Sequence, residues 1–281
     1  MATTRIAKLE HYGLLHAAGD DARAFLHAQL TNDVANLGPG RARYAGWCSA
    51  KGRLLATFLV VPHAGGFLLQ LSRDLVPAIA KRLSMFVLRS KVKITDATGQ
   101  WAQYGIWGAD DGESLSVSES DRTIAVRIEP DRRLVLAAEP SAGRYAPDAA
   151  AEDWILAEIR AGRPLIAGVT QDQFVPQMVN LELAGGVDFH KGCYPGQEVV
   201  ARAQYRGAVK RRMYRLRGAA LQPGQDLYSD DAPGQASGTV VNAAGDESLA
   251  VLQISAVDAG SPFRAQPQAA ALEVLPLRYA Q

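Results

Sequence analysis

Short apolar runs rich in β-branched and aromatic residues recur along this chain, separated by turn residues. The runs Leu54–Val61 and Phe67–Leu71 flank His63-Ala-Gly-Gly, a combination that predicts a β-hairpin. From about Tyr214 to the end, shorter runs alternate with turns such as Gln222-Pro-Gly, which is typical of a small antiparallel barrel or sandwich. We therefore predict a chain rich in antiparallel sheet whose last part is a β-rich domain.

Three amphipathic segments predict helices between these runs. Residues 20–31 carry apolar side chains at helical spacing, and Asp20 is placed to cap the N-terminus. A second helix is predicted over 75–86, with Pro77 tolerated in its first turn, and a third over 153–161, ended by Gly162 and Pro164. The predicted fold class is α+β.

Composition limits the classes of partner. The chain has 281 residues, of which 48% are hydrophobic, so two or three domains are expected. Its 30 Lys and Arg balance 29 Asp and Glu, so no overall field draws it to nucleic acid or an anionic membrane. The N-terminus lacks the apolar core of a signal peptide, and no stretch approaches the roughly 20 apolar residues that span a bilayer. We expect a cytoplasmic protein without a membrane partner.

Cys193 lies in a segment whose glycine and proline residues predict a fixed position for its thiol. Gly192 precedes Cys193, and Tyr194-Pro195-Gly196 predicts a turn that holds the thiol in place. Lys191 favours the thiolate, which is the reactive form. The alternative is that Cys193 is a small buried hydrophobe. With only Cys48 elsewhere and His190 nearby, the chain lacks the clustered ligands of a resident metal, although Cys193 as a transient cluster ligand completed by a partner stays open.

The segment Lys191-Gly-Cys-Tyr-Pro-Gly-Gln-Glu198 resembles the signature motif of the YgfZ family of folate-binding proteins, which has mitochondrial iron–sulfur assembly relatives. The resemblance covers most of the chain and is weakest over 100–150. The other segments that carry it are Gly19–Ala22, Phe25-Leu26, Gln29–Asp33, Cys48–Arg53, Phe174–Glu182, Gly185–Phe189, Ala201-Arg202 and Tyr205–Gly207.

The resemblance implies a fold. YgfZ proteins resemble the aminomethyltransferase of the glycine cleavage system, a three-domain ring that holds tetrahydrofolate in a central channel. By this likeness, residues 1–45 and 150–205 form a folate-binding domain, 46–149 form a second α+β domain, and 206–281 form the C-terminal β-barrel.

The resemblance also implies a folate site. Tyr12, where we expect Trp in the family, and Trp154 correspond to its folate-associated aromatic positions, and flat rings hold a pterin well. The alternative for Trp154 is core packing. Within the matching segments we expect further cofactor contacts from Gln177, Asn180, Tyr194 and Gln197, and we expect Arg160, Arg202 or Arg206 to receive the glutamate tail.

This sequence departs from the transferase pattern. Ala56 and Thr57 stand where the aminomethyltransferase has acidic residues, and Arg160 replaces its pterin-reading acid. None of the three supplies a carboxylate to the reaction or to the pterin N–H groups. We therefore do not expect transferase turnover.

The leading hypothesis is a tetrahydrofolate-dependent accessory factor for iron–sulfur cluster assembly or repair, with Cys193 as a redox or ligand thiol tuned by Lys191. Its partners are then iron–sulfur assembly proteins or client enzymes, and its effect on tRNA methylthiolation is indirect. One alternative is a folate-dependent one-carbon transferase. Another is an RNA-binding module that uses the basic residues between 202 and 217, although we expect Arg215 and Arg217 to lie on the solvent face of a strand.

Overall fold

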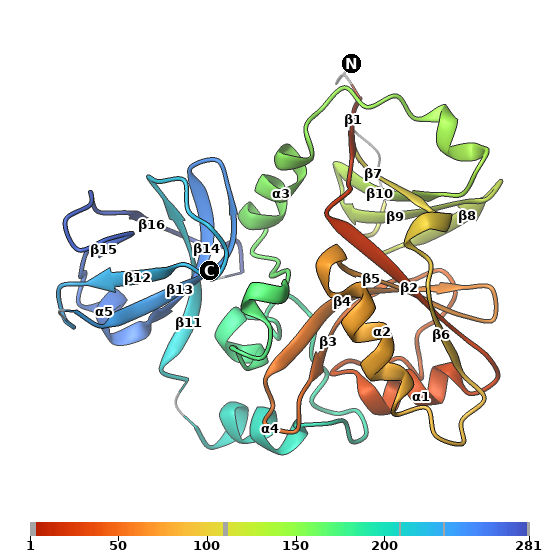
Figure 1. The fold of residues 1–281 in the computed structure, drawn as a ribbon, viewed down its shortest axis with the longest axis horizontal. Helices are drawn as coiled ribbons and strands as arrows, with labels where there is room; N and C mark the ends of the chain where they lie inside the picture. Colours follow the sequence, from red (N-terminus) through yellow and green to blue (C-terminus); the bar gives the residue numbers. More distant parts are fainter. Residues whose placement is uncertain (1–3, 109–111, 208, 233, 280–281) are drawn as a thin grey trace.

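The computed structural model describes residues 4–108, 112–207, 209–232 and 234–279. Within these residues the strands form three antiparallel sheets (Figure 1). The first sheet has the order β3 (Arg43–Cys48), β4 (Leu54–His63), β5 (Gly66–Ser72), β2 (Tyr12–Ala18) and β6 (Lys93–Asp96). The second has the order β1 (Arg5–Lys8), β7 (Ala102–Trp107), β10 (Arg132–Ala137), β9 (Thr123–Glu129) and β8 (Val117–Ser120).

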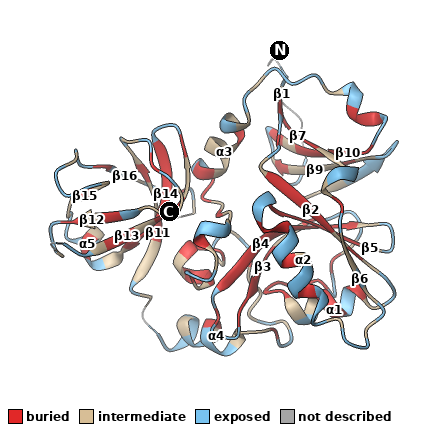
Figure 2. Ribbon diagram, viewed as in Figure 1, coloured by how far each residue is buried: buried red, intermediate tan, exposed pale blue. Residues whose placement is uncertain are grey.

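The first sheet is covered on both faces, and Figure 2 shows β2 and β4 buried along most of their length. Alternate residues of β4 belong to different cores, because successive side chains of a strand point to opposite faces. Phe58 and Val60 join the core that contains α1 and α2, whereas Leu59 and Val61 pack with the second sheet. This is why β4 is buried over nearly its whole length and consists mostly of apolar residues.

The hairpin predicted over 54–71 is confirmed. Strands β4 and β5 pair down to His63 and Gly66, which leaves Ala64 and Gly65 as the turn. Both turn residues have positive φ, 39° and 70°, as two-residue hairpin turns that match the twist of the strands require.

The predicted helices are present as α1 (Ala22–Gln29), α2 (Val76–Ser84) and α3 (Ala151–Arg160), and α4 (Gln197–Tyr205) and α5 (Ile254–Asp258) complete the set in the described residues. The prediction that Asp20 caps α1 is wrong. Asp21 occupies the N-cap position without a capping side-chain hydrogen bond, and its carboxylate instead accepts the backbone N–H of Lys91 at 2.7 Å. The carboxylate of Asp20 lies 3.5 Å from Lys91 Nζ.

The C-terminal sheet is antiparallel, as predicted. Its order is β15 (Phe263–Arg264), β12 (Asp226–Ser229), β13 (Ala236–Ala244), β14 (Glu247–Gln253), β11 (Arg211–Arg217) and β16 (Glu273–Leu275). The sheet curls until its two edges meet, since the backbone N–H of Leu272 donates to Phe263 at 2.8 Å.

Helix α3 contacts β1 of the second sheet and β13 and β14 of the C-terminal sheet, and it lies between these two sheets in Figure 1. The first sheet takes β2 from one predicted domain and β4, β5 and β6 from the other, and β3 crosses the boundary predicted at residue 45. The three-domain division stays a prediction. Of the residues assigned to the predicted domains, 1–3, 109–111, 208, 233 and 280–281 lie outside the described structure. No helix of the described chain is long and apolar enough to cross a bilayer.

Candidate functional site

A cavity of about 190 Å³ lies where α3, the first sheet and the C-terminal sheet come together. Its wall is mainly apolar, with a few polar groups, as is usual for small-molecule sites. The lining residues that matter most here are His11, Tyr12, Tyr44, Thr57, Gln70, Ser72, Trp154, Glu158, Arg163 and Asn242.

Two predicted folate residues meet in this cavity. Tyr12 is 9% exposed and Trp154 is 2% exposed, and the Trp154 side chain lies close enough to the Tyr12 phenol to act on its pKa, in the direction opposite to burial. Burial is the main cause that raises the pKa of Tyr12 above its ordinary value, so the phenol is neutral. Trp154 also packs edge-on against Trp107, with ring centroids 5.4 Å apart. The two rings therefore form a fixed aromatic wall that is also part of the core.

The position of Trp154 depends on a glycine in β7. A Cβ atom added to Gly105 would lie 2.2 Å from Cε3 of Trp154, closer than any side chain allows. The indole thus lies directly on the backbone of the second sheet, and only glycine leaves room for it.

A buried charge network forms the wall beside the rings. Glu158 Oε1 accepts hydrogen bonds from Arg132 at 2.7 Å and from Arg163 at 2.9 Å. Glu129 joins the same two arginines from β9, at 2.7 Å and 3.1 Å. Burial opposes the charge of Arg163, yet Tyr44, Glu158 and Glu129 outweigh it and hold the pKa of Arg163 above its ordinary value.

The sequence prediction missed Glu158, although a signal was present. Trp154 and Glu158 are four residues apart in α3, so they share one face of the helix. The acid that the transferase likeness seeks at position 160 is absent, but a carboxylate reaches the cavity from two residues earlier in the chain.

His11 is a second residue that the sequence prediction missed. Both of its ring nitrogens are buried without a hydrogen-bond partner, and its ring centroid lies 4.1 Å from that of Tyr12. Burial lowers the pKa of His11 to about 4, and the nearby Glu158 carboxylate opposes this shift only in part. The imidazole is therefore neutral at physiological pH.

Thr57 faces the cavity where the transferase likeness expects a carboxylate. Its hydroxyl donates to the carbonyl of Pro164 and accepts the N–H of Ile166, both at 3.1 Å. The adjacent Ala56 is fully buried. Thr57 thus holds the segment after α3 in place, and neither position brings an ionisable group to the cavity.

Arg160 does not belong to the cavity lining. Its guanidinium binds Oε1 of Glu247 at 2.8 Å and 3.1 Å and so joins α3 to β14. The hydrogen bond to Glu247 is the largest cause of its raised pKa. Its assignment to the folate tail stays a prediction.

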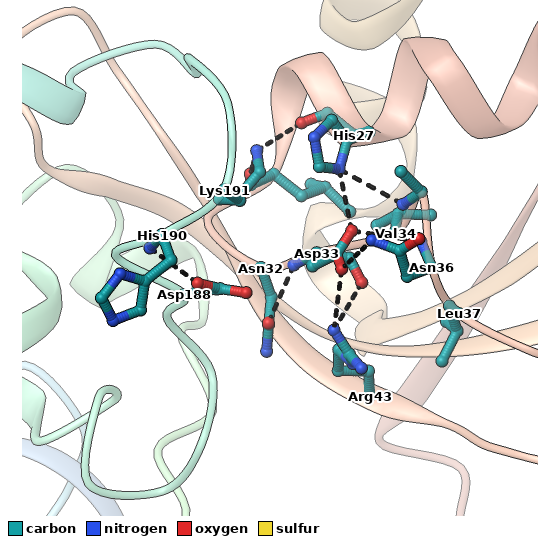
Figure 3. A network of polar contacts seen from close by, with 12 residues as sticks. His27, Asn32, Asp33, Val34, Asn36, Leu37, Arg43, Asp188, His190 and Lys191 are labelled. Atoms are coloured by element: carbon teal, nitrogen blue, oxygen red, sulfur yellow. Dashed lines mark hydrogen bonds and ion pairs between the residues drawn. The ribbon is translucent and has the colours of Figure 1, made fainter.

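The segment with Cys193 lies apart from the lining residues of the cavity, and its thiol is exposed. Lys191 anchors this segment to the end of α1, because its ammonium donates to the carbonyl of Leu30 at 2.8 Å and also to the carbonyl of His27 (Figure 3). Burial lowers the pKa of Lys191 to about 8, against the pull of Asp33, Asp188 and Cys193. Lys191 therefore caps a helix C-terminus two residues before Cys193 in the chain.

Asp33 makes polar contacts beside the end of α1, where Lys191 is anchored. Its carboxylate lies 3.2 Å from His27 Nδ1, accepts the Asn36 side chain at 2.8 Å and lies 3.8 Å from Arg43 (Figure 3). Burial opposes ionisation of Asp33, but the bonds from Asn36 and the charges of Arg43 and His27 lower its pKa. These contacts of Asp33 help to fix the end of α1, to which Lys191 anchors the segment with Cys193.

Two of the matching sequence segments pack against each other here. Gly196 has φ +77°, and Tyr194 beside it is buried with its ring centroid 4.9 Å from Lys191 Nζ. Gln197 begins α4 immediately after this turn. The predicted turn at Tyr194-Pro195-Gly196 is confirmed, and it packs against the turn between β3 and β4.

Gln177 and Asn180 are buried away from the cavity. Gln177 donates to the carbonyl of Val200 at 2.8 Å, and Asn180 donates to that of Met213 at 2.8 Å. Arg202 pairs with Glu198 one helical turn away, at 2.6 Å, and Arg206 is exposed at the end of α4. None of these four residues lines the cavity, so their folate contacts stay predictions.

Four of the seven basic residues between 202 and 217 contact an acidic side chain, namely Arg202, Arg212, Arg215 and Arg217. Arg212 contacts Glu182 at 2.5 Å, and Arg217 lies 3.5 Å from the buried Glu247. The prediction that Arg215 lies on the solvent face is wrong: its side chain is 18% exposed because it turns toward Glu247, with Nε 3.5 Å from Oε2. Among the described residues, no group of three or more His, Cys, Asp or Glu side chains is placed to hold a metal ion.

Comparison with solved structures supports the fold. The chain aligns with the glycine cleavage system aminomethyltransferase T from Bartonella henselae with a TM-score of 0.78 and 15% identity, covering 99% of this chain and 86% of that one. The predicted α+β ring fold is confirmed. The family model described as the GCVT N-terminal domain matches residues 3–124.

Curated relatives share most of the sequence. The tRNA-modifying protein YgfZ of Klebsiella pneumoniae (strain 342) is 30% identical over 300 residues, which cover 96% of this chain and 91% of the relative. The protein of the same name from Vibrio vulnificus (strain YJ016) is 31% identical over 227 residues, covering 76% of this chain and 70% of the relative. That of Enterobacter sp. (strain 638) is 28% identical and covers 98% and 93%. As its motif segments predict, the chain belongs to the YgfZ family.

Proposed function

We propose that this protein binds a reduced folate in the cavity beside α3 and acts as a cytoplasmic accessory factor for iron–sulfur enzymes, including those that modify tRNA. The observation that carries the proposal is the pairing of Tyr12 and Trp154 in one cavity wall with a carboxylate beside them. Aromatic faces hold a flat pterin, and the Glu158 carboxylate accepts its N–H donors.

The cavity favours binding over transfer of a one-carbon unit. Thr57 and Ala56 leave the positions of the transferase acids without an ionisable group. The carboxylate that is present, Glu158, is already paired with Arg132 and Arg163. An aminomethyl-type reaction lacks its acid here.

In this proposal the Cys193 thiol acts in a step other than folate binding. Cys193 is exposed on a firmly held bend outside the cavity lining, so it is available to a partner protein rather than to the folate ring. We propose that it acts as a redox thiol or as one ligand of a cluster in transit. The curated relatives carry the name tRNA-modifying protein, and the paired arginines of the basic run favour an indirect effect on tRNA.

Calorimetric titration of the reduced, purified protein with tetrahydrofolate tests the binding step. We expect Trp154→Phe to weaken binding by roughly tenfold, since the smaller ring loses stacking area. Trp101→Phe is the matched control, because Trp101 lies outside this cavity. Absence of binding to the wild-type protein would refute the proposal.

The glutamate tail has a separate test. A double variant, Arg202→Ala with Arg206→Ala, and a single variant, Arg160→Ala, report whether any of these arginines receives the tail carboxylates. A Kd for tetrahydrofolate that stays unchanged in both variants removes all three from the site.

A further inference from the structure

Most polar side chains of the cavity wall already have protein partners. Asn242 makes two hydrogen bonds with the backbone of Leu165, at 2.8 Å and 2.9 Å. Gln70 donates to Gln103 at 2.8 Å, and Ser72 donates to Asp74 at 2.6 Å. Thr57 is likewise engaged on both sides. These groups shape the cavity but have little left to offer a ligand.

His11 differs from these groups. Its Nδ1 and Nε2 are both buried and both without a partner, in a side chain that lines the cavity. A buried polar atom left unpaired costs on the order of 1–3 kcal/mol. A neutral imidazole offers one N–H donor and one acceptor, so the missing partner is a group, or a pair of groups, with the complementary pattern.

Glu158 determines which hydrogen-bonding groups a ligand can present beside His11. Both of its ion pairs use Oε1, and its negative charge reaches His11 strongly enough to oppose the effect of burial on that imidazole. A carboxylate accepts hydrogen bonds and donates none. The edge of the ligand that faces Glu158 must therefore carry N–H donors, while Arg163, which also lines the cavity, balances the charge of this carboxylate.

We propose that His11 and Glu158 form the specificity-determining pair of the cavity and read the polar edge of a neutral heterocycle of the pterin class. This inference rests on the proposed folate function. Glu158 accepts ring or amino N–H groups, and His11 donates to one ring heteroatom and accepts from another. The anionic glutamate tail is directed away from this pair.

The test compares binding of ligands that carry the pterin, the glutamate tail or both. Wild-type, His11→Gln and His11→Phe proteins are titrated with tetrahydrofolate, with a tetrahydropterin that lacks the tail, and with p-aminobenzoylglutamate, which lacks the pterin. His16→Gln is the matched control, because His16 also has a buried, unpartnered Nε2 but lies outside the cavity lining.

We expect His11→Phe to weaken binding of tetrahydrofolate and of the tailless tetrahydropterin by roughly tenfold, because the ring heteroatoms lose their partner. His11→Gln keeps one donor and one acceptor and should restore most of the affinity. Neither change should affect any binding of p-aminobenzoylglutamate, and His16→Gln should behave as the wild type.

Two failures are distinguishable. If the wild-type protein binds neither tetrahydrofolate nor the tetrahydropterin, the proposed function fails. If it binds both and His11→Phe binds equally well, His11 is satisfied by water and the inference fails. Should His11→Phe not fold, the ring ¹⁵N shifts of His11 in the wild-type protein decide: they must move on addition of the tetrahydropterin, and unchanged shifts contradict the inference.

Discussion

A Cβ atom added to Gly196 would lie 2.4 Å from the carbonyl oxygen of Ser49, so the bend that carries Cys193 rests directly on the turn between β3 and β4. Two segments about 145 residues apart, each part of the YgfZ-like pattern, thereby meet at one point. The position of the thiol depends on this contact as well as on Lys191.

Replacing Gly196 with alanine should therefore disturb the bend. We expect a loss of about 2 kcal/mol or more in unfolding free energy, from the positive φ and from the collision with Ser49. Gly65→Ala is the matched control, because Gly65 has φ +70° but open space around its Cα. Urea unfolding measures both variants, and equal losses would show that backbone strain, rather than packing against Ser49, is the whole effect.

Removal of Arg132 should be among the most harmful single changes. Its side chain is 2% exposed and lies between Glu129 and Glu158, which would be left as two partly buried carboxylates balanced by Arg163 and Arg278. We expect Arg132→Met to cost about 3–5 kcal/mol in unfolding free energy. The exposed Arg144, replaced in the same way, should cost under about 1 kcal/mol. A loss of similar size in both variants would contradict the structural role assigned to the network.

His11 should make the protein sensitive to acid. Its pKa is about 4 in the folded protein and near 6.5 when unfolded, so between these values the unfolded chain binds a proton that the folded one does not. Stability is unaffected at pH 7 and falls as the pH drops below about 6.5. Between pH 7 and 4.5 this one group accounts for a loss of about 2.5 kcal/mol, which His11→Phe should lack. Unfolding curves of both proteins at the two pH values measure the difference, and parallel losses would contradict the burial of a neutral imidazole.

Folate binding and the thiol should be separable. Cys193→Ala is expected to bind tetrahydrofolate with the affinity of the wild-type protein, because Cys193 does not line the cavity. It should nevertheless fail to restore tRNA methylthiolation in a strain that lacks this protein, whereas Cys48→Ala, which removes the other cysteine, should restore it. Full complementation by Cys193→Ala would remove the thiol from the mechanism.

The sequence predicts those parts of the molecule that local pattern controls. The hairpin of β4 and β5 follows from apolar runs around a glycine pair, and the bend at Gly196 follows from its Tyr-Pro-Gly turn. Tyr12 and Trp154 were found only through the resemblance to a family. Their juxtaposition in one cavity is a tertiary fact, since β2 and α3 are separated by more than 130 residues.

Other features depend on partners that no local pattern reveals. The sequence mispredicts the N-terminal cap of α1, because the carboxylate of Asp21 accepts the backbone N–H of Lys91, 70 residues away. The unpaired state of His11 becomes visible only when the cavity is closed around it. Arg215 was expected in solvent because strand alternation cannot show that Glu247 is buried beside it.

A crystal structure of the protein with bound tetrahydrofolate tests the central claim most directly. The pterin should lie in the cavity against Tyr12 and Trp154, with its N–H edge on Glu158 and a ring heteroatom within hydrogen-bond distance of His11. A ligand bound elsewhere, or a cavity that stays closed to it at saturating concentration, would contradict the claim.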